Sequence, residues 1–256
     1  MEILNHKILG EGDPLIYIHG LFGSSDNLLS VAKTLSKDFT IILPDARNHG
    51  TSFHSEEFNY SAMAEDIFYL AQHLSLKEFF LMGHSMGGKI AMEYANKYPN
   101  DIKKLIVVDI SPRYYRPHHQ SFLEGLNSIN LENLTSRNQA DEILSHYVED
   151  VHIRQFLLKN LYRKDDNSFA WRINLNTITN KIENIGEPLK YFKPIEIPTL
   201  FIKGTTSGYI QEKDEVLINE IFINNKIEKI EGAGHWVHAE KPFEFCKTVR
   251  NFLLSN

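Results

Sequence analysis

The chain has 256 residues, of which 42% are hydrophobic and 23% charged, with 14 glycines and 9 prolines. This is the composition of an ordinary globular protein, and the length suits one large α/β domain or such a domain with an inserted lobe. The net charge of −6 arises from both signs spread along the chain. Because there is no basic run or stripe, nucleic acid is not an expected partner.

The sequence also carries no signal for a membrane or for secretion. No apolar run is long enough to span a bilayer, and the opening residues, MEILNHKILGEGDP, lack a basic start followed by a long apolar run. The single cysteine, Cys246, excludes an intrachain disulfide, which fits a reducing compartment. We therefore expect a cytoplasmic protein without a membrane span, and the sequence leaves its oligomeric state open.

Short apolar runs that end in glycine, aspartate or proline recur along the chain. The first five are almost continuously hydrophobic, which is typical of strands buried on both faces of a parallel sheet. The predicted strands are residues 15–18, 40–43, 79–82, 105–108, 199–202 and 226–230. Helix-like segments lie between several of them, and the predicted helices are residues 27–35, 61–74, 86–97 and 242–254. This alternation predicts a doubly wound α/β fold with helices on both faces of the sheet.

The alternation of strands and helices breaks between Pro112 and Pro194. This segment is polar and rich in helix patterns, of which LTSRNQADEILSHYVED and VHIRQFLLKNLYR are the clearest amphipathic pieces. We predict a core formed by residues 1–111 and 195–256. Residues 112–194, called the insertion below, should lie over one edge of the sheet.

The stretch Gly-His-Ser-Met-Gly at residues 83–87 is the strongest chemical signal. It matches Gly-x-Ser-x-Gly, and it follows a predicted strand and precedes a predicted helix, as a nucleophile elbow requires. A turn this sharp strains its central residue and needs glycine on both flanks. Ser85 is therefore the candidate nucleophile, pointing into the crevice at the carboxyl ends of the strands.

A serine hydroxyl needs a base, and His235 is the candidate among the 12 histidines. It lies in the glycine-flanked loop GAGHWVH between the last predicted strand and the last helix. His84, beside the nucleophile, should point away from the crevice, and His238 suits a structural role. The pair His118 and His119 has no nearby carboxylate or cysteine set, so no metal site is expected there.

Developing negative charge on the substrate needs hydrogen-bond donors. The glycine-containing loop HGLFG, residues 19–23, follows a predicted strand and lets the backbone approach the reacting carbonyl. One donor should be an amide of this loop, which we assign to Leu21. The second should be the amide of Met86, the residue after the nucleophile.

Five blocks, HGLFGSSDN, PDARNHGTS, GHSMGGK, VVDISP and GAGHWVHAEKP, together resemble the α/β-hydrolase superfamily. They are most similar to its small YbfF-type bacterial esterases, relatives of the abhydrolase-domain proteins. The resemblance implies the α/β-hydrolase fold, with a mostly parallel sheet of about eight strands and the insertion as a helical cap. It further implies ester or thioester hydrolysis without a cofactor. Serine at the elbow argues against the branches that use an aspartate nucleophile, such as dehalogenases.

The sequence offers two candidates for the acidic residue that would orient His235 and complete a catalytic triad. Most of the superfamily places it in the loop after the strand that here reads PTLFIKG, but residues 205–210 contain no carboxylate. We favour Asp109, at the end of the strand that follows the nucleophile helix, over Asp214, which reads as part of a helix start with Glu212. Ser207 stands where the missing acid would be and is a candidate to support the triad.

These residues predict a serine hydrolase that cleaves esters or thioesters of small to medium acyl chains, acyl-CoA included. The alternatives left open are a C–C bond hydrolase or cofactor-free haloperoxidase of the same fold, and a catalytically silent binding protein. An apolar wall is expected beside the nucleophile. The candidates for it are Phe22, Tyr114, Tyr209 and Trp236.

Overall fold

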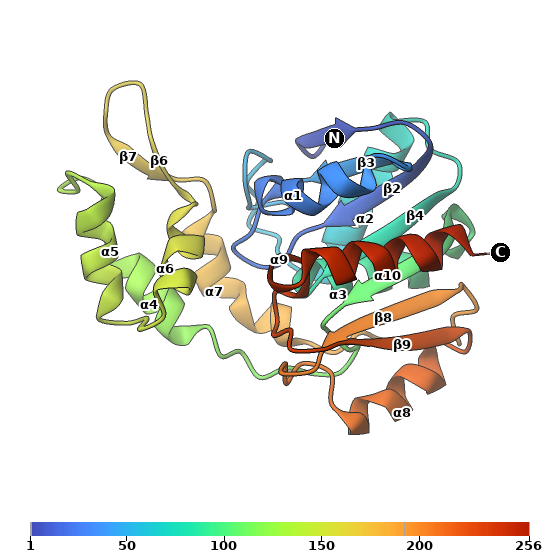
Figure 1. Cartoon of the computed structure of the whole chain (residues 1–256). Coiled ribbons are helices and arrows are strands. Elements are labelled where there is room, and N and C mark those ends of the chain that lie inside the picture. Colours follow the sequence, from blue (N-terminus) through green and yellow to red (C-terminus); the bar gives the residue numbers. More distant parts are fainter. Residues whose placement is uncertain (1, 192, 256) are drawn as a thin grey trace.

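The computed structural model describes residues 2–191 and 193–255, which are built around a seven-stranded sheet (Figure 1). The strand order is β1-β3-β2-β4-β5-β8-β9, and every neighbouring pair is parallel except β1 with β3. The strands are β1 (His6–Leu9), β2 (Asp13–Ile18), β3 (Phe39–Pro44), β4 (Phe79–His84), β5 (Ile102–Val108), β8 (Thr199–Gly204) and β9 (Asn225–Ile230). The predicted α/β-hydrolase fold is therefore confirmed.

All six strands predicted from apolar runs are present, and each prediction lies within an observed strand. The sheet of the described residues has seven strands where about eight were expected. Its additional member, β1, was not predicted, because its side chains are mostly half-buried and give no continuous apolar run. It pairs antiparallel at the edge of the sheet, where strands do not need two buried faces.

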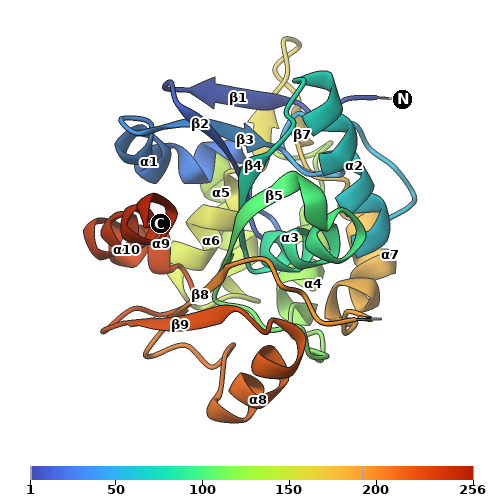
Figure 2. The ribbon, with the colours of Figure 1, turned by 90° about the vertical axis from the view of Figure 1, so that its right-hand side faces the viewer.

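Helices cover both faces of the sheet (Figure 2). On one face α1 and α10 pack through Val31, Leu35, Phe245 and Val249 against β2 and β3, and on the other α2 and α3 form a second buried cluster. No helix in the described ranges is both long and apolar enough to cross a bilayer. The core helices are α1 (Ser25–Leu35), α2 (Tyr60–His73), α3 (Met86–Lys97), a short 3₁₀ helix (Pro99–Asp101), α8 (Glu212–Ile221), α9 (Val237–Glu240) and α10 (Pro242–Leu254).

The helix starts follow from local sequence. Ser24 and Asn27 form a reciprocal capping box at the start of α1. The Asn59 side chain accepts a hydrogen bond from the amide of Ala62 at the start of α2, and Pro242 opens α10 where its missing N–H costs nothing. The three predicted helices at these places are therefore present with starts shifted by no more than two residues.

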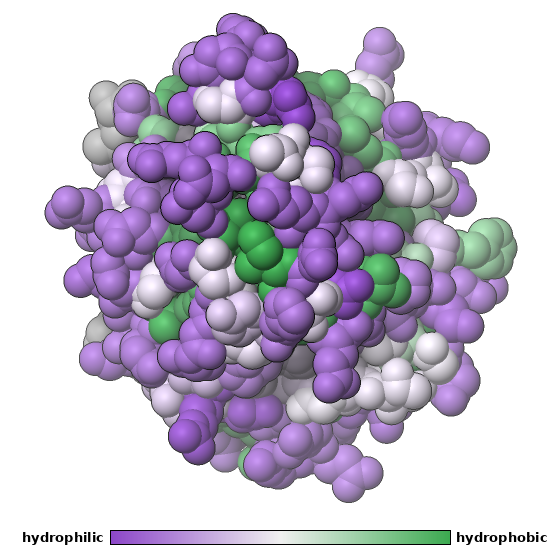
Figure 3. Space-filling view, turned by 90° about the vertical axis from the view of Figure 1, so that its left-hand side faces the viewer, coloured by the Kyte–Doolittle hydropathy of each residue, from purple (hydrophilic) through white to green (hydrophobic). Residues whose placement is uncertain are grey.

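The elements between β5 and β8 stand beside the sheet in Figure 1. The two amphipathic segments predicted for the insertion contain α5 and α6. Figure 3 views the molecule from the left-hand side of Figure 1, where the insertion stands. The surface seen there is mostly hydrophilic, with apolar side chains visible near its middle. The elements of the insertion are α4 (Gln120–Ser128), α5 (Arg137–Ser145), α6 (Val151–Leu158), the antiparallel pair β6 (Leu161–Arg163) and β7 (Phe169–Trp171), and α7 (Leu175–Gly186).

A buried lysine fastens both ends of the insertion to the helix that begins at Ser85. Lys89 lies in the first turns of α3 and is fully buried. Its Nζ donates to the carbonyl oxygen of Arg113, 2.9 Å away, where the chain enters the insertion, and to that of Glu187, where the chain leaves it. The two passing segments also pair directly, since the Tyr115 amide donates to the Gly186 carbonyl at 2.8 Å.

Burial also perturbs this lysine electrostatically. Removal from water, together with the nearby Arg113, lowers the pKa of Lys89 from 10.5 to about 7. The rings of Tyr60 and Tyr115 lie 5.4 and 5.1 Å from Nζ and compensate part of the lost hydration. The unfolded chain therefore binds a proton at this side chain more tightly than the folded protein does.

We expect the contribution of Lys89 to stability to depend on pH. Below about pH 7 both states hold the proton and the cost of burying the charge is fully present. Between about pH 7 and 10.5 the folded protein has lost it first, so the free energy of unfolding of the wild type should rise relative to Lys89→Met. The slope should not exceed about 1.4 kcal/mol per pH unit. Urea unfolding of both proteins across this range measures it, and a difference independent of pH would contradict the assignment.

Candidate active site

Ser85 occupies a strained turn between β4 and α3. Its backbone has φ 54° and ψ −117°, a conformation that residues with a side chain rarely adopt. Glycines make the turn possible: a Cβ on Gly83 would lie 2.0 Å from the carbonyl oxygen of Gly87, and one on Gly87 would lie 2.4 Å from that of Ile18. The sheet and α3 therefore approach too closely for any other residue at these two positions.

Parallel pairing brings distant residues to the same edge of the sheet. In the register of β4 with β5, His84 lies opposite Val108, so Ser85 and Asp109 leave neighbouring strands at the same level. The Ser85 amide donates to the carbonyl oxygen of Val108 at 3.0 Å. Because β9 is parallel to β8 and β8 to β5, the loop carrying His235 leaves the sheet at this edge too.

The carboxylate of Asp109 is hydrogen-bonded to the His235 ring. The distance from His235 Nδ1 to Asp109 Oδ2 is 2.7 Å, and the aspartate side chain is fully buried. The Gly204 amide donates to Oδ1 at 3.2 Å, and the Ser207 hydroxyl donates to Oδ2. A carboxylate removed from water needs such partners, and these come from two segments, the end of β8 with its following loop and the loop after β9. Asp109 itself has φ 50°, so a strained backbone holds it in place.

Two rings fix the imidazole of His235 from the sides. The Tyr209 ring stacks on it with centroids 3.8 Å apart and planes at 15°, and the Tyr209 hydroxyl lies 2.8 Å from His118 Nε2. His84 approaches from the other direction, with its Nε2 2.8 Å from the carbonyl oxygen of His235. Burial, and next the neighbouring His235, lowers the pKa of His84 well below the ordinary histidine value. His84 is therefore a neutral packing partner.

Asp214, the alternative acid, has other partners. Its Oδ2 accepts a hydrogen bond from the Gln211 amide at 2.8 Å, in a capping box at the start of α8. Its other oxygen lies 2.9 Å from Arg113 Nε, and the side chain is buried. Glu212, two residues earlier, is exposed. Asp109 is thus the hydrogen-bond partner of His235, whereas Asp214 caps α8 and contacts Arg113 at the start of the insertion.

A cavity of about 610 Å³ opens between the core and the insertion, with both Ser85 and His235 in its wall. Of the four predicted pocket residues, Phe22, Tyr209 and Trp236 line it. Tyr114 lies outside its lining, and 49% of its surface is exposed, because the segment after β5 turns this ring toward solvent. The lining is mainly apolar, as ligand sites generally are.

The loop of residues 19–23 is held from several directions. His19 Nε2 accepts from the amide of Ala46 at 3.0 Å, and His49 Nε2 accepts from that of Phe22 at 3.2 Å. Burial lowers the pKa of His49 to about 3, so its ring is neutral and able to accept. From the insertion, the buried Asn160 donates to the carbonyl oxygen of Phe22 at 2.8 Å. Sequence reasoning missed Asn160, because it lies 138 residues away from its partner in a segment without a motif.

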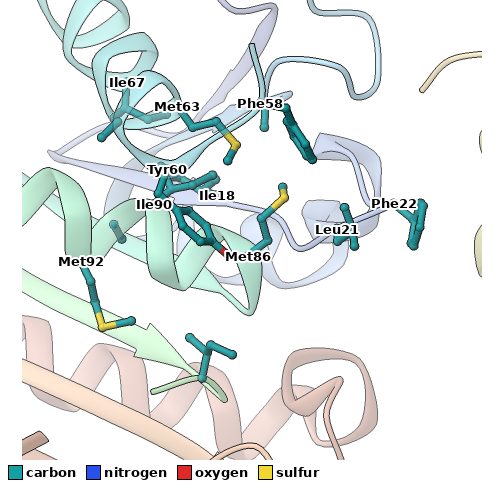
Figure 4. Close-up of a cluster of buried hydrophobic side chains, with 14 of the residues drawn as sticks. Ile18, Leu21, Phe22, Phe58, Tyr60, Met63, Ile67, Met86, Ile90 and Met92 are labelled. Atoms are coloured by element: carbon teal, nitrogen blue, oxygen red, sulfur yellow. The ribbon is translucent and has the colours of Figure 1, made fainter. Parts of the chain in front are cut away.

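Two backbone amides remain without an acceptor beside Ser85. The Leu21 amide has no hydrogen-bond partner in the part of the chain that the structure describes, and the Met86 amide is the first of α3, which no helical carbonyl can reach. Figure 4 shows that both side chains belong to the buried apolar cluster that also holds Phe58 and Tyr60. Their burial fixes the two peptide units on either side of the turn.

The polar residues of the loop after β3 have structural partners. Asp45 accepts from the Ser25 and Thr51 amides, and Arg47 pairs with the buried Asp66 at 2.6 Å, so these residues organise the loop after β3. Among the described residues, no three His, Cys, Asp or Glu side chains are grouped so that they could hold a metal ion. The pair His118 and His119 is therefore not part of such a group.

Comparison with known proteins agrees with this architecture. A family described as "alpha/beta hydrolase fold" matches residues 13–242. A solved marine microorganism esterase superposes with a TM-score of 0.96 at 40% identity, covering 98% of this chain and 100% of that one.

Curated relatives carry related names. A Danio rerio protein named sn-1-specific diacylglycerol lipase ABHD11 is 37% identical over 95% of this chain and 79% of its own length. Esterase YbfF of Escherichia coli is 34% identical over 94% of this chain and 92% of its own length. The chain therefore belongs to the α/β-hydrolase family, and its esterase and lipase relatives support hydrolysis of esters as its activity.

Proposed function

We propose that the protein hydrolyses carboxylic esters, and thioesters by the same route, with Ser85 as nucleophile, His235 as general base and Asp109 as the acid that orients it. The observation that carries the proposal is the 2.7 Å contact between His235 Nδ1 and the buried carboxylate of Asp109. It directs the other ring nitrogen, Nε2, toward accepting a proton. Ser85 and His235 share one cavity wall, so a bound substrate can meet both.

Acylation begins when His235 takes the proton of the Ser85 hydroxyl and the serine oxygen attacks the ester carbonyl. The negative charge that develops on the carbonyl oxygen is received by the amides of Leu21 and Met86. Loss of one such donor typically costs about 3 kcal/mol of barrier. The imidazolium then gives its proton to the leaving alcohol or thiol as the bond to the acyl carbon breaks.

Deacylation repeats these steps with water. His235 takes a proton from the water, the resulting oxygen attacks the acyl-enzyme, and the serine leaves with the proton restored. Asp109 compensates the positive charge of the ring in both halves. The Ser207 hydroxyl shares Oδ2 of Asp109 with His235, so we assign it the support of this carboxylate.

The finer alternatives differ by substrate. A C–C bond hydrolase would cleave diketones, a haloperoxidase would need peroxide and halide, and a silent binding protein would do neither. The unpartnered amides beside a strained serine favour the hydrolase, because a protein that only binds has no use for the strain. Acyl-CoA as a substrate and a cytoplasmic location belong to this proposal as well.

Covalent labelling tests the nucleophile. A fluorophosphonate probe should attach to the wild type at a single serine and should fail to label Ser85→Ala, since Ser85 is the one serine among the residues that line the cavity with His235. Intact-mass spectrometry and peptide mapping measure the adduct. Ser111→Ala is the matched control: Ser111 is buried two residues after Asp109 but does not line the cavity, and labelling should match the wild type. Failure to label the folded wild type would favour the binding protein.

Two aspartate variants test the acid. Asp109→Asn removes the charge that fixes the tautomer of His235 and should lower kcat by about 10⁴-fold, the loss that the same change causes in Ser-His-Asp proteases. Asp214→Asn keeps an acceptor at the start of α8 and should change kcat by no more than about threefold. Steady-state hydrolysis of a chromogenic ester compares them. The opposite ranking would transfer the role to Asp214.

A further inference from the structure

A second, smaller cavity of about 40 Å³ adjoins the nucleophile. It extends toward α2 and α7, and the residues that it shares with the large cavity are Leu21, Ser85, His118, His119 and Tyr209. Met86 and Tyr60 are part of its wall, and neither lines the large cavity. Ser85 thus stands where two cavities of very different size meet.

The small cavity is lined mostly by apolar side chains. Tyr60 and Ile110 are buried, and Ile182 and Ile185 of α7 belong to the same wall. The lining also includes the exposed residues Arg116 and His118. The hydroxyl of Tyr60 is already used, because it donates to the carbonyl oxygen of Ile185 at 2.7 Å. A water-sized group needs about 10–15 Å³ of such space, so the cavity has room for about three or four non-hydrogen atoms.

The position of His235 decides which part of an ester enters which cavity. A leaving alcohol must take its proton from the imidazole, and His235 lines the large cavity only. The carbonyl oxygen must face the amides of Leu21 and Met86. The remaining substituent of the tetrahedral carbon, the acyl chain, is then directed to the side away from His235, where the small cavity lies.

We infer that the small cavity is the acyl subsite and that the preferred substrates are esters of short acids, with about two to four carbons, and large apolar alcohols. The alcohol part occupies the large cavity, against the aromatic rings of Phe22, Phe156 and Trp236. This inference rests on the proposed function and adds the substrate class to it.

Two substrate series test this assignment on the wild-type protein. In the first, the alcohol is 4-nitrophenol and the acyl chain grows from acetyl to dodecanoyl. We expect kcat/KM to be highest between two and four carbons and to fall at least tenfold by octanoyl. In the second, the acid is acetic acid and the linear alcohol grows from ethanol to decanol, followed by pH-stat titration. Here we expect kcat/KM to rise at least tenfold with length.

Three isoleucine variants identify the subsite. Ile182→Ala and Ile185→Ala each enlarge the small cavity and should move the acyl optimum toward longer chains, with the alcohol series unchanged. Ile153→Ala is the matched control, since Ile153 lines only the large cavity. It should leave the acyl optimum in place and alter the alcohol series.

The outcomes are separable. An acyl optimum at eight carbons or more in the wild type overturns the inference, whatever the variants do, and leaves the proposed function standing if the fluorophosphonate adduct forms on Ser85. A shift of the acyl optimum in Ile153→Ala but in neither α7 variant would exchange the roles of the cavities and also overturn it. Absence of both labelling and ester cleavage would remove the proposed function itself.

Discussion

The hydrogen bond between Asp109 and His235 is the interaction on which the rest of the site depends. It joins two loops that are 126 residues apart in sequence, and it can form only because β5, β8 and β9 run parallel and end at one edge of the sheet. A buried carboxylate without donors would be very costly. Gly204, at the end of β8, and Ser207, in the loop after it, donate hydrogen bonds that offset this cost.

Burial keeps three histidines near the site neutral, namely His19, His49 and His238. Burial lowers the pKa of His49 to about 3 and that of His238 to about 4, and it lowers the pKa of His19 as well. His19 and His49 each have Nδ1 close to a backbone carbonyl and accept an amide at Nε2. These two histidines therefore hold the 19–23 loop without adding charge beside Ser85.

The insertion takes part in the site at several points. Asn160 holds the carbonyl oxygen of Phe22, His118 meets the hydroxyl of Tyr209, and Phe156 packs against Trp236 with ring centroids 5.8 Å apart. Lys89 ties both of its connections to the helix that begins at Ser85. Residues of the insertion also form walls of both cavities.

The sequence by itself determined the α/β alternation, because continuous apolar runs have few stable arrangements other than buried parallel strands. It also singled out Ser85 as the candidate nucleophile. The glycines on both sides of it mark a turn whose close contacts only glycine tolerates. Asp109 could be favoured but not separated from Asp214, because the distance of each carboxylate from His235 depends on strand order. Tertiary structure alone decided which aspartate pairs with His235, the hydrogen bond from Asn160 to Phe22 and the unequal cavities beside Ser85. Each of these depends on contacts between segments that no local sequence pattern relates.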